Sequence, residues 1–142
     1  RGITDVPALV ERFRAERAPG APVRVEVDDT ARARTPREIQ AAAYRVVVEG
    51  LTNIRRHAAP GCPVTVSVGC EPDGTLSVLV LNEVDPHPRS PDWRLRAHAG
   101  TGLVALQERV VALGGHLDAG RDDTGWWRLE VTLPASDQRS VP

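Results

Sequence analysis

Three polar side chains, Glu49, Asn53 and Arg56, lie at helical spacing in the segment from residue 36 to residue 58. Steps of four and then three residues make them neighbours on one face of a helix. An asparagine in mid-helix costs about 0.5 kcal/mol against alanine, so stability alone does not favour it. Its amide oxygen is a neutral, hard ligand for Mg²⁺, and a glutamate carboxylate accepts a proton or holds a metal-bound water. The stripe is therefore either a solvated helix face or a site for metal and phosphate chemistry.

A glycine turn, Gly100-Thr101-Gly102, precedes a second strongly periodic helix. Glycine permits close backbone approach, and the N–H groups of a first helical turn favour an anion such as phosphate. The same residues also suit a plain flexible helix start. Two familiar nucleotide-binding motifs are excluded here. A Rossmann turn needs a preceding strand and a third glycine, and a P-loop needs Gly-Lys-Ser/Thr.

The composition limits the classes of protein to which this chain can belong. The chain has 142 residues, 41% of them hydrophobic and 26% charged, as expected of one globular domain with a real core. Its net charge of −1 gives no basic excess for direct contact with nucleic acid. No window resembles a membrane span or a signal peptide, so we expect a cytoplasmic domain whose membrane anchor, if the full-length protein has one, lies outside this chain.

The two cysteines, Cys62 and Cys70, stand on either side of one expected strand. An extended segment of this length separates them by about 26 Å, which is too far for a disulfide. Unpaired cysteines suit a reducing compartment.

The elements that must position the polar residues follow from hydrophobic periodicity and turn signals. Helices are predicted at 5–17, 36–58 and 103–113, and strands at 23–27, 64–70, 76–81, 116–119 and 126–133. The strand at 76–81 is apolar on both faces, which places it inside a sheet. On the last strand the odd positions, Trp127 to Leu133, form the expected core face.

This order of elements predicts an α+β fold, a two-layer α/β sandwich in which three helices cover one face of a mixed, mostly antiparallel sheet. Residues 1–134 form the domain. Residues 83–99 are rich in proline and lack periodicity, which indicates a functional or a disordered loop, and residues 135–142 are expected to be a disordered tail.

The polar stripe belongs to a longer motif. The run Glu49-Gly50-Leu51-Thr52-Asn53-Ile54-Arg55-Arg56-His57-Ala58 resembles the asparagine box of the superfamily of gyrase, heat-shock chaperone, histidine-kinase and mismatch-repair ATPases. Its spacing, E-x-L-x-N-x-x-[KR]-H-A, is the version seen in sensor histidine kinases.

The glycine turn belongs to a second motif. Gly100-Thr101-Gly102-Leu103 and the residues up to Leu113-Gly114-Gly115 are similar to the segment G-x-G-L-x-x-L-x-E-R-V-x-x-L-G-G. That segment marks a kinase subgroup that pairs with response regulators carrying a helix-turn-helix output domain. The resemblance covers residues 5–134. The chain thus resembles the ATP-binding catalytic domain, of Bergerat (GHKL) fold, of a bacterial two-component sensor histidine kinase.

This resemblance implies a site for ATP and Mg²⁺ between the long helix, an ATP lid at about 83–99 and the third helix. Asn53 would coordinate Mg²⁺. Glu49 would be the catalytic residue that holds or activates a water or the attacking group, and would reach the metal through a water. Arg56 and His57 would contact phosphates. The backbone around Gly100, Thr101, Gly102 and Leu103 would cradle the phosphate chain.

The sequence departs from the family where the adenine-binding Asp-x-Gly-x-Gly box should follow the strand at 76–81. The chain reads Asn82-Glu83-Val84-Asp85-Pro86 there, without either glycine. Asn82 stands at the aspartate position and should point inward. Its oxygen can accept from the adenine amino group and its NH₂ can donate to a ring nitrogen. Because the amide of Asn82 is neutral, its hydrogen bond to adenine lacks the charge assistance that a carboxylate gives, which costs about 1 kcal/mol of binding free energy.

The function implied is transfer of the γ-phosphoryl group of Mg-ATP to a histidine on a separate dimerisation domain of the same kinase, and then to the receiver domain of a response regulator. None of the four histidines is followed by an acidic residue, so the phosphoacceptor lies outside this chain. The full-length protein is expected to be a homodimer.

Two alternatives stay open. The altered adenine box suits a degenerate GHKL domain that senses nucleotide or binds proteins without kinase activity. An anti-sigma-type serine kinase on the same fold agrees less well with the two motifs.

Overall fold

The computed structural model describes residues 1–83 and 101–134. Residues 84–99 of the predicted lid at 83–99, the first glycine of the turn, Gly100, and the predicted tail at 135–142 lie outside the described residues. Among the described helices, none is long and apolar enough to cross a bilayer.

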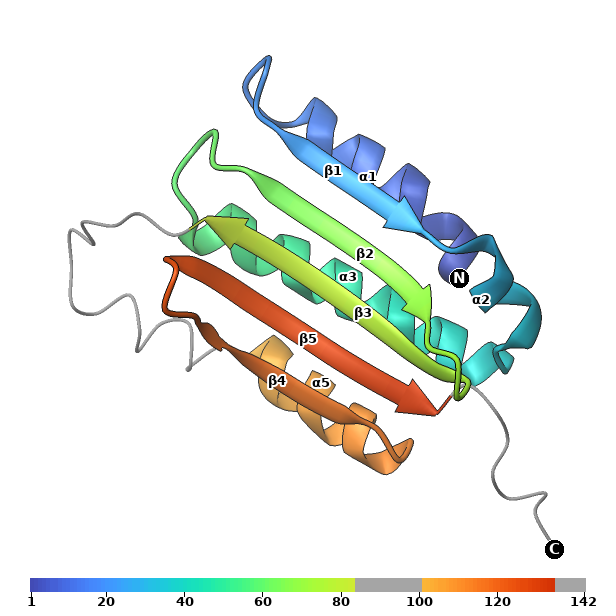
Figure 1. The fold of residues 1–142 in the computed structure, drawn as a ribbon. Helices are drawn as coiled ribbons and strands as arrows, with labels where there is room; N and C mark the ends of the chain where they lie inside the picture. The colour runs from blue at the N-terminus through green and yellow to red at the C-terminus, as the bar shows by residue number, and fades with distance from the viewer. Residues whose placement is uncertain (84–100, 135–142) are drawn as a thin grey trace, which may run out of the picture.

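Five strands form one sheet (Figure 1). They are β1 (Val23–Val27), β2 (Val64–Cys70), β3 (Thr75–Glu83), β4 (His116–Arg121) and β5 (Trp126–Pro134), in the order β1-β2-β3-β5-β4. Strands β1 and β2 pair in parallel and the other neighbours pair antiparallel. The mixed, mostly antiparallel sheet is therefore confirmed, and β3 lies inside it, between β2 and β5, as its two apolar faces predicted.

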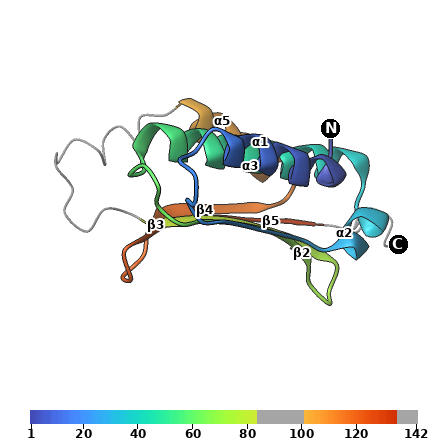
Figure 2. The ribbon, with the colours of Figure 1, turned by 90° about the horizontal axis from the view of Figure 1, so that it is seen from above.

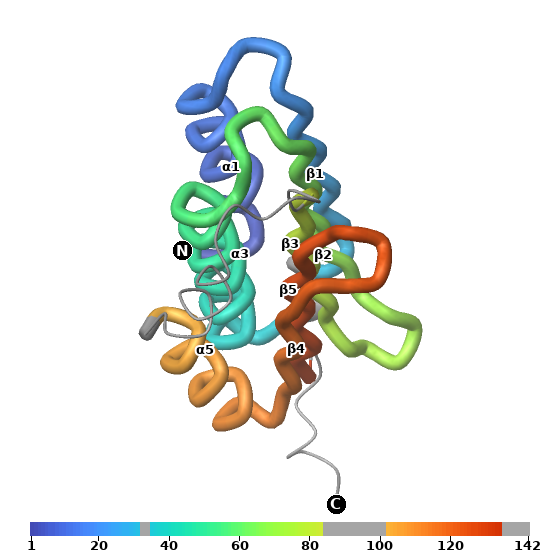
Figure 3. Tube along the Cα trace, turned by 90° about the vertical axis from the view of Figure 1, so that its left-hand side faces the viewer, coloured from blue at the N-terminus to red at the C-terminus, as the bar shows by residue number. Residues whose placement is uncertain are grey.

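The three longer helices lie on one face of this sheet (Figures 2 and 3). After a short 3₁₀ turn, η1 (Ile3–Asp5), they are α1 (Val6–Ala15), α3 (Arg37–His57) and α5 (Thr101–Ala112). Burial alternates along the central strands, and the inward side chains Leu76, Val78 and Val80 of β3 are 0–1% exposed. The helices cover these side chains, so the two-layer sandwich is confirmed.

One element was not predicted, the short helix α2 (Asp29–Arg34) after β1. Asp28 caps it: the carboxylate accepts from the Thr30 backbone N–H at 2.9 Å and from the Thr30 hydroxyl at 2.7 Å. Both hydrogen bonds lower the pKa of Asp28, and the bond from the Thr30 hydroxyl has the larger effect. The cap was visible in the sequence as Asp28-Asp29-Thr30. Smaller differences are that α1 ends at Ala15 and that β3 extends to Glu83.

The C-terminal end of α3 is anchored on α1. Arg55 Nε donates to Glu16 Oε2 at 2.8 Å. The guanidinium carbons of Arg55 and Arg17 each lie 5.2 Å from the centre of the buried Phe13 ring. Both cysteines are free, as predicted, and the backbone carbonyl of Cys62 accepts from Arg17. These contacts hold the half of α3 that carries the candidate site residues.

Gly50 lets α3 rest directly on the centre of the sheet. A Cβ at this position would lie 2.9–3.0 Å from side-chain carbons of Val80. We expect Gly50→Ala to lower the free energy of unfolding, because overpacking costs about 1–3 kcal/mol and exceeds the roughly 1 kcal/mol that alanine gains in helix propensity. Urea unfolding measures the change.

Gly69→Ala on β2 is the matched control, since a Cβ there meets no atom within 4 Å. If the two variants were equally stable, the contact of α3 with Val80 would not set the distance between helix and sheet.

Candidate functional site

The polar stripe of α3 lies on the side of the helix toward α5, and the gap is the name used below for the region between this stripe, the sheet and the first turn of α5. Gly50 points at Val80 of β3, and Glu49 points at Gly102 of α5, where a Cβ would lie 2.3 Å from Glu49 Oε2. At about 100° per residue, Asn53 projects about 60° away from the direction of Gly50, on the side of Glu49. Asn53 therefore points between the sheet and α5.

Asn82 lies at the same level along the sheet as Asn53. Helix α3 and strand β3 run toward the same end of the molecule (Figure 1). From the contact of Gly50 with Val80, two strand residues advance roughly 6.6 Å and three to four helix residues advance roughly 5–6 Å. The turn that carries Asn53 therefore passes over the level of Asn82, so the predicted metal and adenine residues border one gap.

Glu49 is held against the first turn of α5. Its side chain is 17% exposed, and its Oε1 lies 3.6 Å from Nε of Arg45, which is itself 63% exposed. The N-terminal end of a helix stabilises a negative charge by a few tenths of a kcal/mol to about 1 kcal/mol. This contact joins the two sequence motifs in space, and it puts a proton acceptor at the position where the glycine turn enters α5.

Asn53 is half-buried, and its amide makes no hydrogen bond within residues 1–83 and 101–134. The neighbouring Thr52 donates its hydroxyl to the Val48 carbonyl oxygen at 2.8 Å, a local bond that a helix tolerates with slight bending. The amide of Asn53 is thus the polar group of this pair that remains available to a ligand.

Asn82 is 4% exposed and points inward, as predicted from the alternation along β3. Its Nδ2 donates to the Glu83 carbonyl oxygen at 3.3 Å. Because a carbonyl only accepts, this bond assigns the amide nitrogen to Glu83 and leaves Oδ1 as the acceptor for a ligand. An acceptor here matches the amino group of adenine.

The other predicted site residues lie at the margins of the gap. Arg56 and His57 are exposed in the last turn of α3. Thr101 is the first residue of α5, and Leu103 packs against the core. The pairing of β3 with β5 adds one residue to the candidate site. Trp127 of β5, which the sequence placed only on a core face, lies directly opposite Asn82. Knowledge of the β3–β5 pairing would have identified it.

The oxygen ligands in this gap fit Mg²⁺ bound together with a phosphate. In the described parts of the chain, no three His, Cys, Asp or Glu side chains are grouped closely enough to hold a metal. Mg²⁺ is usually held by one or two protein oxygens, several waters and substrate phosphates. The amide oxygen of Asn53 would supply one such oxygen, and the Glu49 carboxylate would reach the metal through a water.

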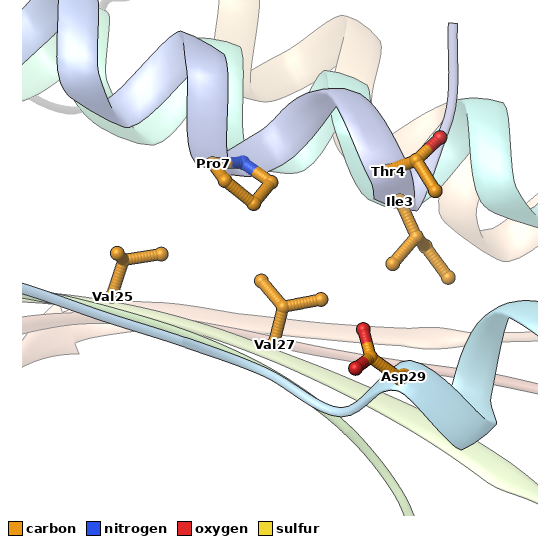
Figure 4. Close-up of a pocket in the computed structure, with 6 residues that line it drawn as sticks. All are labelled: Ile3, Thr4, Pro7, Val25, Val27 and Asp29. Atoms are coloured by element: carbon orange, nitrogen blue, oxygen red, sulfur yellow. The ribbon is translucent and has the colours of Figure 1, made fainter.

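A pocket of about 250 Å³ lies elsewhere, between the first helical turns and the edge strand β1 (Figure 4). Its lining is mainly apolar: Ile3, Thr4, Pro7, Val25, Val27 and Asp29. Because β1 and β4 are the opposite edges of the sheet, this pocket is separate from the gap beside α5.

Comparison with known proteins gives matches in structure. No family model matches the sequence, and no curated protein matches it closely enough to be counted a relative. The histidine kinase domain of the blue-light activated histidine kinase EL346 of Erythrobacter litoralis matches with a TM-score of 0.72 and 23% identity, over 97% of this chain and 63% of that one.

Two further structures match over nearly their whole length. The mycobacterial sensor histidine kinase MprB has a TM-score of 0.64 and 19% identity, over 97% of this chain and 99% of that one. The nucleotide-free catalytic domain of histidine kinase ThkA has a TM-score of 0.66 and 15% identity, over 96% and 92%.

The chain spans less than two thirds of the Erythrobacter kinase domain and nearly all of the ThkA catalytic domain. At these identities the likeness is one of fold. The fold expected from the two motifs is confirmed, whereas the pairing with helix-turn-helix regulators stays a prediction. This chain has the fold of the catalytic domains of histidine kinases.

Proposed function

We propose that this domain binds Mg-ATP and donates its γ-phosphoryl group to a histidine on a separate dimerisation domain. The observation that carries the proposal is the contact between the Glu49 carboxylate and Gly102, since it brings the asparagine-box helix and the glycine turn to one gap. Asn53 and Asn82 border that gap with oxygen acceptors. In this proposal a metal–phosphate subsite and a base subsite lie side by side.

Each side chain has a role that its chemistry permits. Asn82 accepts from the adenine amino group through Oδ1. Asn53 supplies a neutral oxygen to Mg²⁺, which when bound offsets the charge of the phosphates. Arg56, exposed one turn after Asn53, adds positive charge beside the phosphates, together with His57. The backbone amides from Gly100 to Leu103 would hold the phosphate chain.

Glu49 is the residue that acts on the reacting group. Its carboxylate would accept a proton from, or orient, the attacking imidazole, and would hold a water beside the metal. Phosphoryl transfer needs little covalent chemistry from the protein, so most of the catalysis is positioning and charge stabilisation. The proposed partners follow: the histidine-bearing dimerisation domain of the same kinase and then a response-regulator receiver domain, with the kinase acting as a homodimer in the cytoplasm.

Titration calorimetry with Mg-ATP tests this proposal. We expect Asn53→Ala to weaken binding about 10- to 100-fold, the range for losing one polar contact to a charged group. Removing Mg²⁺ with EDTA should weaken ATP binding to the wild-type domain and leave Asn53→Ala almost unchanged, because that variant has already lost the metal contact.

Thr52→Ala is the matched control. Thr52 is the adjacent residue, and its hydroxyl is bonded to the Val48 carbonyl rather than facing the gap, so its loss should leave affinity unchanged. If the wild-type domain, shown to be folded by circular dichroism, gives no heat with Mg-ATP, the kinase proposal fails and the degenerate interaction module replaces it. Phosphoamino-acid analysis of the labelled product would identify a serine kinase.

A further inference from the structure

One row of inward-facing residues crosses the sheet at the end where the candidate site lies. Register places Val64 of β2 and Trp127 of β5 on the two sides of Asn82. Arg121 of β4 follows on the far side of Trp127. Directly opposed side chains on one sheet face have Cβ atoms about 4.5–5.5 Å apart. The indole of Trp127 and the amide of Asn82 are therefore neighbours.

The core ends at this row. Along β5 the inward side chains Leu129, Val131 and Leu133 are each 0% exposed, whereas Trp127, next on the same face, is half-buried. The same change occurs on β4. Leu117 and Ala119, which lie opposite Val131 and Leu129, pack against the core, and the next residue on that face is Arg121. Trp127 is thus a large aromatic side chain at the boundary between core and gap.

Trp127 also lies on the side of Asn82 toward which Asn53 points. Glu49 contacts α5, and α5 packs on β4 next to β5, so the polar stripe of α3 faces the β5 side of the sheet. A ligand that reaches from Asn53 to Asn82 has the face of β5 beside it. The side chain that β5 presents at that level is Trp127.

We propose that Trp127 is a base-binding residue whose indole packs against the nucleobase held by Asn82, an inference that rests on the proposed function. Stacking of a base on an aromatic side chain is worth about five- to hundredfold in affinity. That gain is comparable with or larger than the loss of under tenfold expected from a neutral amide in place of a carboxylate. The domain therefore binds its base through apolar stacking as well as through one neutral hydrogen bond.

Calorimetry on three variants tests the inference. Trp127→Ala should weaken Mg-ATP binding about five- to hundredfold, while Trp127→Phe, which keeps an aromatic ring, should lose less. Trp126→Ala is the matched control, because Trp126 lies opposite Glu83 on the other face of the sheet and should bind as the wild type does. Inorganic triphosphate, which has no base, should bind all four proteins alike.

Fluorescence gives a second measurement that does not depend on removing Trp127. In a Trp93→Phe, Trp126→Phe protein, Trp127 is the remaining tryptophan of the three. ATP and ADP should quench its emission, and inorganic triphosphate should not. Circular dichroism and thermal melting establish that each variant is folded.

The possible outcomes separate the two proposals. If the wild-type domain binds Mg-ATP but Trp127→Ala binds equally well and the emission of Trp127 does not change, the stacking role is wrong and the proposed function stands. If Trp127→Ala binds more tightly, the indole occupies the space of the base and the inference is overturned. If the wild-type domain binds no nucleotide, both proposals fall.

Discussion

Glu49→Gln is expected to lower the rate of phosphoryl transfer about 10²- to 10⁴-fold, the range that a positioned general base contributes. Glutamine keeps the size of the side chain and its contact with Gly102 but cannot accept the proton. Loss of the negative charge at the start of α5 costs at most about 1 kcal/mol, so the domain stays folded. Mg-ATP affinity should change little, because the base and most phosphate contacts remain.

The measurement is transfer of label from γ-labelled ATP to the histidine-bearing dimerisation domain, supplied as a separate chain, with calorimetry on the same proteins. Arg45→Gln is the control. It removes the charged neighbour at 3.6 Å but not the carboxylate, and an ion pair with a partner 63% exposed contributes about 0–1 kcal/mol. If Glu49→Gln and Arg45→Gln lowered the rate of phosphoryl transfer equally, Glu49 would act only through its charge on the helix and not as a proton acceptor.

Those parts of the site that depend on one element could be predicted from the sequence. The spacing of Glu49 and Asn53 made them neighbours on a helix, because helical geometry is local. Alternation along β3 turned Asn82 inward for the same reason. The pattern of apolar and polar residues also predicted that the helices cover one face of the sheet, because each apolar stripe must be buried against another element.

Contacts between elements distant in the chain could not be predicted from periodicity. Whether Glu49 meets Gly102 depends on how α5 packs beside α3, and only the resemblance to a family indicated it. Trp127 lies beside Asn82 because β5 returns next to β3 while β4 takes the edge of the sheet. The sequence pattern gave the face of Trp127 but not its strand neighbour, because pairing order is a property of the whole sheet.

Gly102→Ala is expected to reduce phosphoryl transfer about 100-fold without unfolding the domain, because a misplacement of about 1 Å at a catalytic group costs rates of that order. The new Cβ would lie 2.3 Å from Oε2 and 3.1 Å from Cδ of Glu49. These atoms are the far end of a flexible side chain, so Glu49 rotates away and α5 keeps its place. Alanine also favours the helix.

Gly115→Ala provides the contrast, since its Cβ would lie 2.4 Å from the backbone carbonyl oxygen of Thr132, which cannot rotate away. That variant should lose stability, whereas Gly102→Ala should melt at the wild-type temperature or above. The decisive measurement is a double-mutant cycle with Glu49→Gln. If Gly102 acts by giving the carboxylate its position, Gly102→Ala has little further effect on transfer once the carboxylate is gone. Independent, multiplicative losses would mean instead that position 102 serves the nucleotide directly, through the backbone of the first turn of α5.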